Sequence, residues 1–132
     1  MDKGSVPKFK VLIVDDQEQM RAFLRAALKT LPVHIMDLDN GFDAMALIET
    51  ERPDLLLIDY LMPGFDGITL CQDLRRRTDL KPIKTVLITG ETTPALLLEA
   101  VNHKLVDAAL TKPVDMHELQ GLVKRLLALD QS

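Results

Sequence analysis

Five polar residues that could carry out chemistry each stand directly after or at the end of a short apolar run. Asp15 and Asp16 follow one run, Asp59 a second, Thr89 a third and Lys112 a fourth. Carboxylates held close together repel one another unless a cation lies among them, and oxygen ligands with room for water suit Mg²⁺. A carboxylate can also attack phosphorus when a metal ion, an ammonium and a hydroxyl balance the charge on the phosphoryl oxygens. The combination predicts a metal-assisted phosphoryl-acceptor site.

Each aspartate taken alone has a simpler explanation as a helix N-cap or a turn residue. That explanation gives no reason for a threonine and a lysine to stand at the ends of two further apolar runs. We therefore interpret the five residues as one group.

The apolar runs before these residues predict the strands of a parallel sheet. Runs 11–14, 55–58 and 86–88 are short and apolar throughout, as strands buried on both faces require. Runs 35–38 and 108–111 are weaker strand candidates. Ligands of such sheets bind at the carboxyl ends of the strands, where the five polar residues stand.

Amphipathic stretches between the runs predict helices. Apolar residues recur there at spacings of three and four, which places them on one helix face. Five strand–helix units are too few for an eight-fold barrel, so they predict an α/β fold with an open, doubly wound, five-stranded parallel sheet. This is the flavodoxin-like (βα)5 arrangement, with strand order 2-1-3-4-5. The predicted helices are 20–31, ended by Pro32; 41–51, with Phe42, Met45 and Ile48 on its apolar stripe; 68–74, followed by the solvated arginines Arg75, Arg76 and Arg77; 94–101, opened by Thr93 and Pro94; and 116–127.

Composition and charge narrow the class of protein. The 132 residues fit one domain, 1–132. Lys and Arg number 16 against 20 Asp and Glu, and this net charge of −4 argues against direct binding of nucleic acid. The single cysteine, Cys71, lies on an apolar helix face, which predicts a buried thiol in a reducing cytoplasm. No apolar run reaches about 18 residues, so we expect a cytoplasmic protein with no membrane segment.

Four motifs resemble, in their order and spacing, the receiver domain of two-component response regulators. They are VLIVDD at 11–16, LIDYLMPGFDG at 57–67, LITG at 87–90 and TKP at 111–113. The similarity extends over about residues 9–129. It implies a single receiver domain, with the fold of the chemotaxis response regulators.

The resemblance implies a metal site on the acidic residues. Asp59 and Asp16 would bind Mg²⁺ (or Mn²⁺) directly, while Asp15 would act through water or orient the ion. The backbone carbonyl of Leu61 would be a further ligand.

The resemblance also implies how a phosphoryl group is held. Asp59 would be the phosphoacceptor, Thr89 would donate a hydrogen bond to the phosphoryl group, and Lys112 would pair with it. Pro113 would follow a cis peptide bond, which is low in cost only before proline. The small Gly90 would leave the site open to a donor histidine.

Several positions depart from the family pattern or border the site. The family often carries an aromatic residue three positions before the lysine, whose rotamer reports phosphorylation, but this chain has Ala109 there. We therefore expect the loop 90–94 and the helix after it to respond to phosphorylation instead. In the family, the residues at the positions of Leu61 and Glu91 border the path of the hydrolytic water, so the resemblance implies that these two residues bear on the lifetime of the phosphoryl group.

The function implied is signalling. A receiver takes a phosphoryl group from a sensor histidine kinase or a histidine phosphotransfer protein, and then changes its affinity for an output partner. It catalyses only its own phosphorylation and dephosphorylation, so it is not an enzyme toward an independent substrate. Successive helical residues point about 100° apart, so Leu96, Leu97 and Leu98 cannot all face the sheet. The helix at 94–101 is either broadly buried or an apolar surface for a partner or a second copy of the domain.

Two alternatives differ from this function. A Mg²⁺-dependent phosphohydrolase of the haloacid dehalogenase type uses similar Asp, Thr and Lys groups around an aspartyl nucleophile. That family has a second Asp two positions after the nucleophile, where this chain has Leu61. The other alternative is a phosphorylation-independent interaction module on the same fold, which would not require the complete set of site residues.

Overall fold

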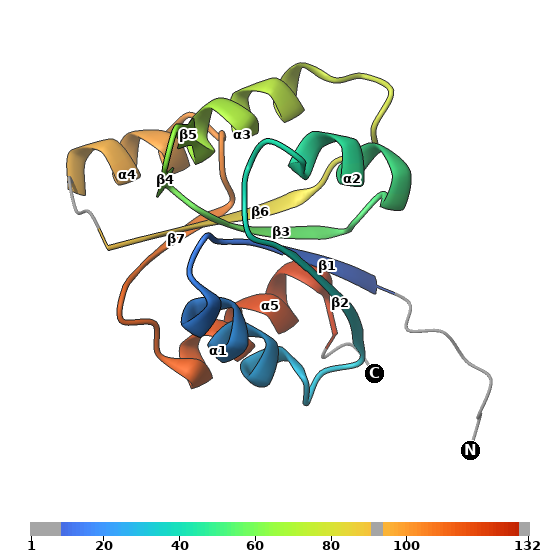
Figure 1. Cartoon of the computed structure of the whole chain (residues 1–132), viewed down its shortest axis with the longest axis vertical. Helices are drawn as coiled ribbons and strands as arrows, with labels where there is room; N and C mark the ends of the chain where they lie inside the picture. Colours follow the sequence, from blue (N-terminus) through green and yellow to red (C-terminus); the bar gives the residue numbers. More distant parts are fainter. Residues whose placement is uncertain (1–8, 91–93, 130–132) are drawn as a thin grey trace.

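The computed structural model describes residues 9–90 and 94–129, which form a central sheet with helices on both faces (Figure 1). None of the described helices is long and apolar enough to cross a lipid bilayer. The elements in chain order are β1 (Phe9–Val14), α1 (Glu18–Leu28), β2 (Val33–Leu38), α2 (Ala44–Glu51), β3 (Leu55–Asp59), β4 (Leu61–Met62), β5 (Phe65–Asp66), α3 (Gly67–Arg76), β6 (Lys84–Thr89), α4 (Pro94–Asn102), β7 (Ala108–Thr111) and α5 (Met116–Leu127).

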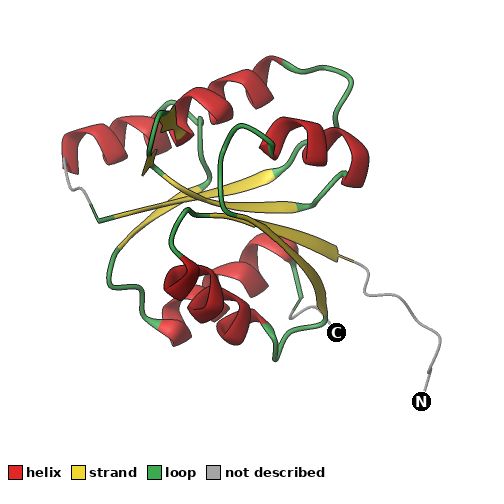
Figure 2. Ribbon diagram, viewed as in Figure 1, coloured by secondary structure: helices red, strands yellow, loops and turns green. Residues whose placement is uncertain are grey.

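The large sheet is parallel throughout, with strand order β2-β1-β3-β6-β7. When the short pair β4–β5 is set aside, this is the predicted order 2-1-3-4-5, so the doubly wound α/β fold is confirmed. Helices α1 and α5 cover one face, and α2, α3 and α4 cover the other (Figures 1 and 2). Because both faces are covered, the inner positions of the central strands are mostly apolar; Asp59 on β3 and Thr85 and Thr89 on β6 are their buried polar residues.

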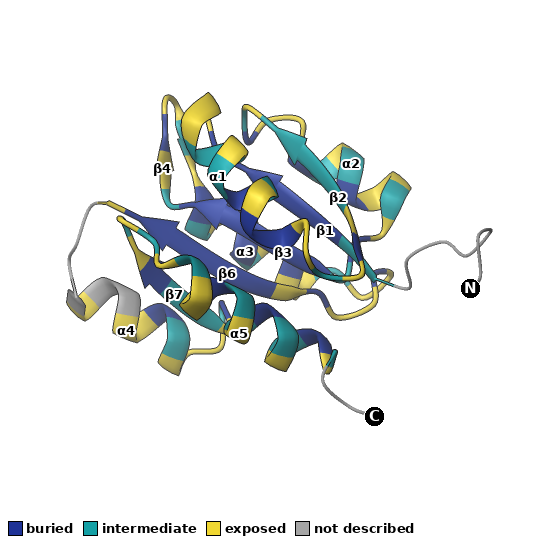
Figure 3. Cartoon of the chain, turned by 90° about the horizontal axis from the view of Figure 1, so that it is seen from below, coloured by how far each residue is buried: buried dark blue, intermediate teal, exposed yellow. Residues whose placement is uncertain are grey.

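Side chains along the central strands alternate between two apolar clusters, one on each face of the sheet. On β1, Leu12 joins the cluster with α2 and α3, whereas Ile13 joins the cluster with α1 and α5. On β3, Leu56 and Leu57 divide in the same way, and all four residues are fully buried. Figure 3 shows this buried sheet between helices whose outer surfaces are exposed. A shift of one residue along either strand would exchange the two sets, so the register is strongly specified.

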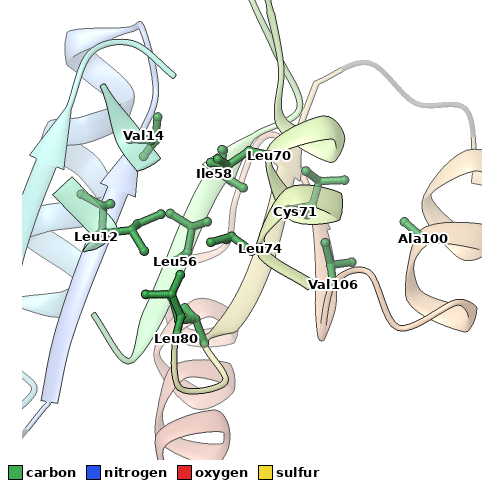
Figure 4. Close-up of a cluster of buried hydrophobic side chains, with 14 of the residues drawn as sticks. Leu12, Val14, Leu56, Ile58, Leu70, Cys71, Leu74, Leu80, Ala100 and Val106 are labelled. Carbon is green, nitrogen blue, oxygen red and sulfur yellow. The ribbon is translucent and has the colours of Figure 1, made fainter. Parts of the chain in front are cut away.

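Cys71 belongs to the cluster that contains α2 and α3 (Figure 4), as the sequence predicts. The residue is 1% exposed, and burial raises the pKa of its thiol to about 12. The thiol therefore stays protonated at neutral pH and acts as a packing group.

The start of the second helix differs from the prediction. α2 begins at Ala44, not Gly41, because the side chain of Asn40 accepts a hydrogen bond from the backbone N–H three residues on (3.0 Å) and stabilises a turn. Phe42, predicted to lie on the buried stripe, is 68% exposed, so that prediction is wrong. Its ring instead meets Phe65 edge to face, with ring centroids 5.3 Å apart.

The arginines at the end of α3 are not simply solvated. Arg77 donates to the carboxylates of Glu49 (2.8 Å) and Asp79 (2.6 Å). Arg75 donates to the carbonyl oxygen of Ile83 at 3.2 Å. Arg75 and Arg76 are exposed, as predicted, whereas Arg77 is partly buried, so the prediction of a solvated helix end is wrong for Arg77. The hydrogen bonds of Arg75 and Arg77 attach α3 to neighbouring segments.

Helix α4 forms where the sequence predicts a helix, and one of its three consecutive leucines can be placed relative to the core. Thr93, its predicted N-cap, lies outside the described residues, as do the side chains of Leu96 and Leu97. Leu98 is 61% exposed, so at least this one of the three leucines points away from the core.

A short antiparallel strand pair, β4–β5, connects the end of β3 to α3, where the sequence predicted only a loop. Gly64 in its turn has φ +69°, a left-handed conformation that glycine adopts at little cost. Gly67 then donates its N–H to the carbonyl of Tyr60 at 2.7 Å. A Cβ atom on Gly67 would lie 2.5 Å from the carbonyl oxygen of Asp59, so only glycine lets α3 begin this close to β3.

Gly67→Ala should lower the free energy of unfolding by about 2 kcal/mol, because the added methyl meets a backbone carbonyl that cannot move aside freely. Urea unfolding followed by circular dichroism measures the change. Gly121→Ala is the matched control: Gly121 lies in α5 with nothing within 4 Å of the added atom. That substitution should stabilise the chain by about 0.5–1 kcal/mol, as alanine does in helices. Equal stability of Gly67→Ala and the wild type would contradict the close contact.

Candidate functional site

The carboxyl ends of four parallel strands bring the predicted site residues to one edge of the sheet. Asp15 and Asp16 follow β1, Asp59 and Thr89 end β3 and β6, and Lys112 follows β7. Most of these residues, together with three neighbours, line a hollow of about 310 Å³ at this edge: Asp16, Gln17, Asp59, Leu61, Thr89, Gly90 and Lys112.

The three aspartates form a compact acidic cluster. One carboxylate oxygen from each of Asp15, Asp16 and Asp59 lies within 4.8 Å of the other two. Asp15 is 1% exposed and Asp59 is 6% exposed, whereas Asp16 is open to solvent. Mg²⁺ prefers a few carboxylate ligands and retains several waters. The donor set, closed on one side and open on the other, therefore fits Mg²⁺.

The ammonium of Lys112 lies between the two buried carboxylates. Its Nζ is 3.3 Å from Oδ2 of Asp15 and 3.4 Å from Oδ2 of Asp59. Buried charges without a partner are costly, so this lysine compensates the negative charge that the fold places there. The peptide bond between Lys112 and Pro113 is cis, as the family resemblance implied.

The surroundings of the Asp59 carboxyl disfavour its ionised form. Burial raises its pKa above the ordinary value, and the negative charge of Asp15 raises that pKa further. Lys112 opposes both effects without cancelling them. Ionised Asp59 is therefore less stable in the folded chain than in the unfolded chain, and a cation at the cluster would relieve this cost.

Asp15 is held by contacts to all of its polar groups. Its N–H donates to the carbonyl of Leu38 at 3.1 Å, and its carbonyl accepts from Arg21 Nη1 at 2.8 Å. Its Oδ1 accepts from the N–H of Gln17 at 2.9 Å, while Oδ2 pairs with Lys112. Gln17 and Arg21 are not among the site residues that the sequence predicted. An arginine early in the helix after an acidic pair is a signal that could have indicated the second.

The remaining predicted residues lie around this centre. Thr89 is 1% exposed, and its carbonyl accepts from the N–H of Lys112 at 2.9 Å. Leu61 is 48% exposed at the edge of the hollow. Ala109 packs against the cluster with α2 and α3, so the position where the family often has an aromatic ring carries a methyl group. Glu91 lies outside the described residues.

Comparison with known proteins agrees with this arrangement. The family model of the response regulator receiver domain matches residues 11–124. The chain belongs to this family. The receiver domain is 34% identical over 123 residues to the cyclic di-GMP phosphodiesterase response regulator RpfG of Xanthomonas campestris pv. campestris, a match that covers 92% of this chain and 32% of that protein.

Two further similarities indicate the extent of the receiver domain. It is 30% identical to the alkaline phosphatase synthesis transcriptional regulatory protein PhoP of Bacillus subtilis, over 89% of this chain and 48% of PhoP. It is 31% identical to the solved signal receiver domain of a signal transduction histidine kinase from Syntrophus aciditrophicus, with a TM-score of 0.79 and coverage of 93% and 92% of the two chains. The receiver domain spans about a third and about a half of the lengths of these two curated relatives, respectively.

Asp59→Asn should raise the free energy of unfolding of this receiver domain at about pH 7.5 without metal, by more than the roughly 0.5 kcal/mol that bounds an ordinary surface substitution. Because the folded-state pKa of Asp59 is raised, its ionisation destabilises the fold fully above that pKa. The cost vanishes below the ordinary pKa of about 4, where the carboxyl is protonated in both states. The gain should therefore shrink as the pH falls.

Urea unfolding at several pH values measures this dependence. Asp73→Asn makes the same chemical change on the exposed surface of α3 and should alter stability by no more than about 0.5 kcal/mol. A variant Asp59→Asn that is no more stable than the wild type at about pH 7.5 would contradict the electrostatic cost at this site.

Proposed function

We propose that this receiver domain accepts a phosphoryl group on Asp59 from a sensor histidine kinase or a histidine phosphotransfer protein, with Mg²⁺ (or Mn²⁺) bound beside it. The observation that carries the proposal is the convergence of Asp59, two further carboxylates and Lys112 at one open edge of the sheet. Residues 9–129 would act as the functional unit within 1–132.

In the proposed reaction, a carboxylate oxygen of Asp59 attacks phosphorus, and the bond from phosphorus to the donor imidazole nitrogen breaks. The electron pair of that bond leaves with the imidazole. Lys112 would pair with the transferred phosphoryl group, and the hydroxyl of Thr89 would donate a hydrogen bond to it. Mg²⁺ held by Asp16, Asp59 and the carbonyl of Leu61 would supply positive charge to the phosphoryl oxygens.

Asp15 would act on the metal through water, or position the ion, as the family resemblance implied. Both of its carboxylate oxygens already have partners, Gln17 on one side and Lys112 on the other. Asp16, which is open to solvent, is the better direct ligand.

The proposed output is a change of partner affinity rather than turnover of an independent substrate. A phosphohydrolase of the dehalogenase type would have a second aspartate at the position of Leu61. The exposed Leu98 on α4 belongs to the surface that we propose for an output partner or a second copy of the domain.

Acetyl phosphate with Mg²⁺ should add one phosphoryl group to the wild-type chain, and Asp59→Asn should abolish the addition, because among the described residues no other acidic cluster of this kind is found. Intact-mass spectrometry measures the addition, and the product should be acid-stable and base-labile, as an acyl phosphate is. Asp73→Asn, on the exposed surface of α3, should be labelled like the wild type. Labelling of Asp59→Asn at the wild-type rate would show that Asp59 is not the phosphoacceptor.

Asp16→Ala should weaken Mg²⁺ binding at least about tenfold, because it removes a charged ligand from a partly buried cluster. Isothermal titration of the unphosphorylated chain with Mg²⁺ gives the affinity. Asp73→Ala removes one exposed negative charge from the surface of α3 and controls for net charge. The proposed metal site would be contradicted if Asp16→Ala, like the control Asp73→Ala, bound Mg²⁺ with the wild-type affinity.

A further inference from the structure

The side chain of Arg21 reaches from the first turn of α1 back to the loop that carries the acidic pair. Its Nη1 donates to the backbone carbonyl of Asp15 at 2.8 Å. The guanidinium also pairs with Glu18, and its Nε lies 3.8 Å from Oδ2 of Asp37 on β2. The Arg21 side chain is 13% exposed, so it is largely withdrawn from solvent to make these contacts.

The carbonyl that Arg21 binds belongs to the peptide bond between Asp15 and Asp16. A peptide unit is planar, so a hydrogen bond to its oxygen restrains the orientation of the whole unit. The N–H on the other side of Asp15 is bound to Leu38 on β2. With both neighbouring peptide units restrained, the direction in which Asp16 extends from the loop is restrained as well.

Arg25, one turn further along α1, provides a natural comparison. It pairs with the same two carboxylates, Glu18 at 3.3 Å and Asp37. Within the described part of the chain, its side chain makes no hydrogen bond to the loop of Asp15 and Asp16. Arg21 and Arg25 therefore carry the same charge in the same ion-pair network, and differ in the contact to the Asp15 carbonyl.

We propose that Arg21 is a positioning residue for the metal site, which holds Asp16 in the orientation that binds Mg²⁺ by fixing the peptide unit between Asp15 and Asp16. The inference rests on the proposed function, because it assumes that the acidic cluster binds the ion. In this role Arg21 raises the affinity for Mg²⁺, although its positive charge by itself lowers that affinity. A guanidinium near the cluster repels a cation, so loss of charge alone would raise the affinity for Mg²⁺.

The test compares Arg21→Gln with Arg25→Gln by isothermal titration with Mg²⁺, under conditions in which circular dichroism shows both chains folded. Arg21→Gln should weaken Mg²⁺ binding about tenfold, the usual lower bound for removing a group that orients a metal ligand. Arg25→Gln removes the same charge and keeps the carbonyl contact, so its affinity should equal or slightly exceed that of the wild type. A purely structural role would lower the stability of Arg21→Gln and leave the affinity of its folded form unchanged.

A second variant and a second measurement guard against misfolding. Arg21→Lys keeps the charge but lacks the planar fork that binds the carbonyl and the carboxylates together, so it should weaken Mg²⁺ binding severalfold. Acetyl phosphate labelling of Arg21→Gln should be slow at low Mg²⁺ and recover at saturating Mg²⁺, since Asp59 itself is unchanged.

The outcomes separate this inference from the proposed function. Wild-type affinity in folded Arg21→Gln or Arg21→Lys, or an equal loss in Arg25→Gln, would overturn the role of Arg21 and leave the acceptor site intact. Failure of the wild-type chain to bind Mg²⁺ at millimolar concentration would overturn the proposed metal site, and this inference with it.

Discussion

The structure depends on keeping two buried carboxylates, Asp15 and Asp59, side by side at the end of the sheet. Like charges in a poorly solvated position repel, and here the repulsion is opposed by the ammonium of Lys112, within 3.4 Å of both. The three residues come from the ends of β1, β3 and β7, so charge balance at one point requires the whole strand order. Loss of Lys112 would leave two buried carboxylates without a counter-charge, a change that generally costs about 3–5 kcal/mol, whereas loss of Asp59 leaves Lys112 paired with Asp15. Lys112 is therefore both part of the functional centre and a determinant of stability.

Around this centre, the chain restrains the backbone as well as the side chains. The helix that follows Asp59 begins at Gly67, whose missing Cβ lets it approach the Asp59 carbonyl. On the other side, the two peptide units that flank Asp15 are bound by Leu38 and Arg21. Such restraints hold the acidic groups close together despite their mutual repulsion. The repulsion lowers stability, and the rest of the fold offsets this loss.

The sequence by itself determined the layers of the fold and the composition of the site. Strand cores such as 55–58 are apolar at every position, and a strand has this pattern only when both of its faces are covered by other parts of the fold. A parallel sheet places its strand ends at one edge, so the positions of Asp15, Asp16, Asp59, Thr89 and Lys112 in the sequence already predicted that they meet. The roles of these residues in phosphoryl transfer came from the family resemblance and stay proposals.

Only the tertiary structure decided the contacts of polar residues whose local sequence looks like that of any solvated residue. In the sequence, Arg21 differs from Arg25 only in lying one helical turn closer to the acidic pair, and the difference in contacts arises because its guanidinium reaches the loop after β1. Arg77 donates a hydrogen bond to Glu49, which lies 28 positions away in the sequence. Phe42 does not lie on the buried helix face, because a turn stabilised by Asn40 precedes the start of α2. Periodicity reports which side of an element faces the core, and it carries no information about how a polar or loop side chain is paired once distant segments come together.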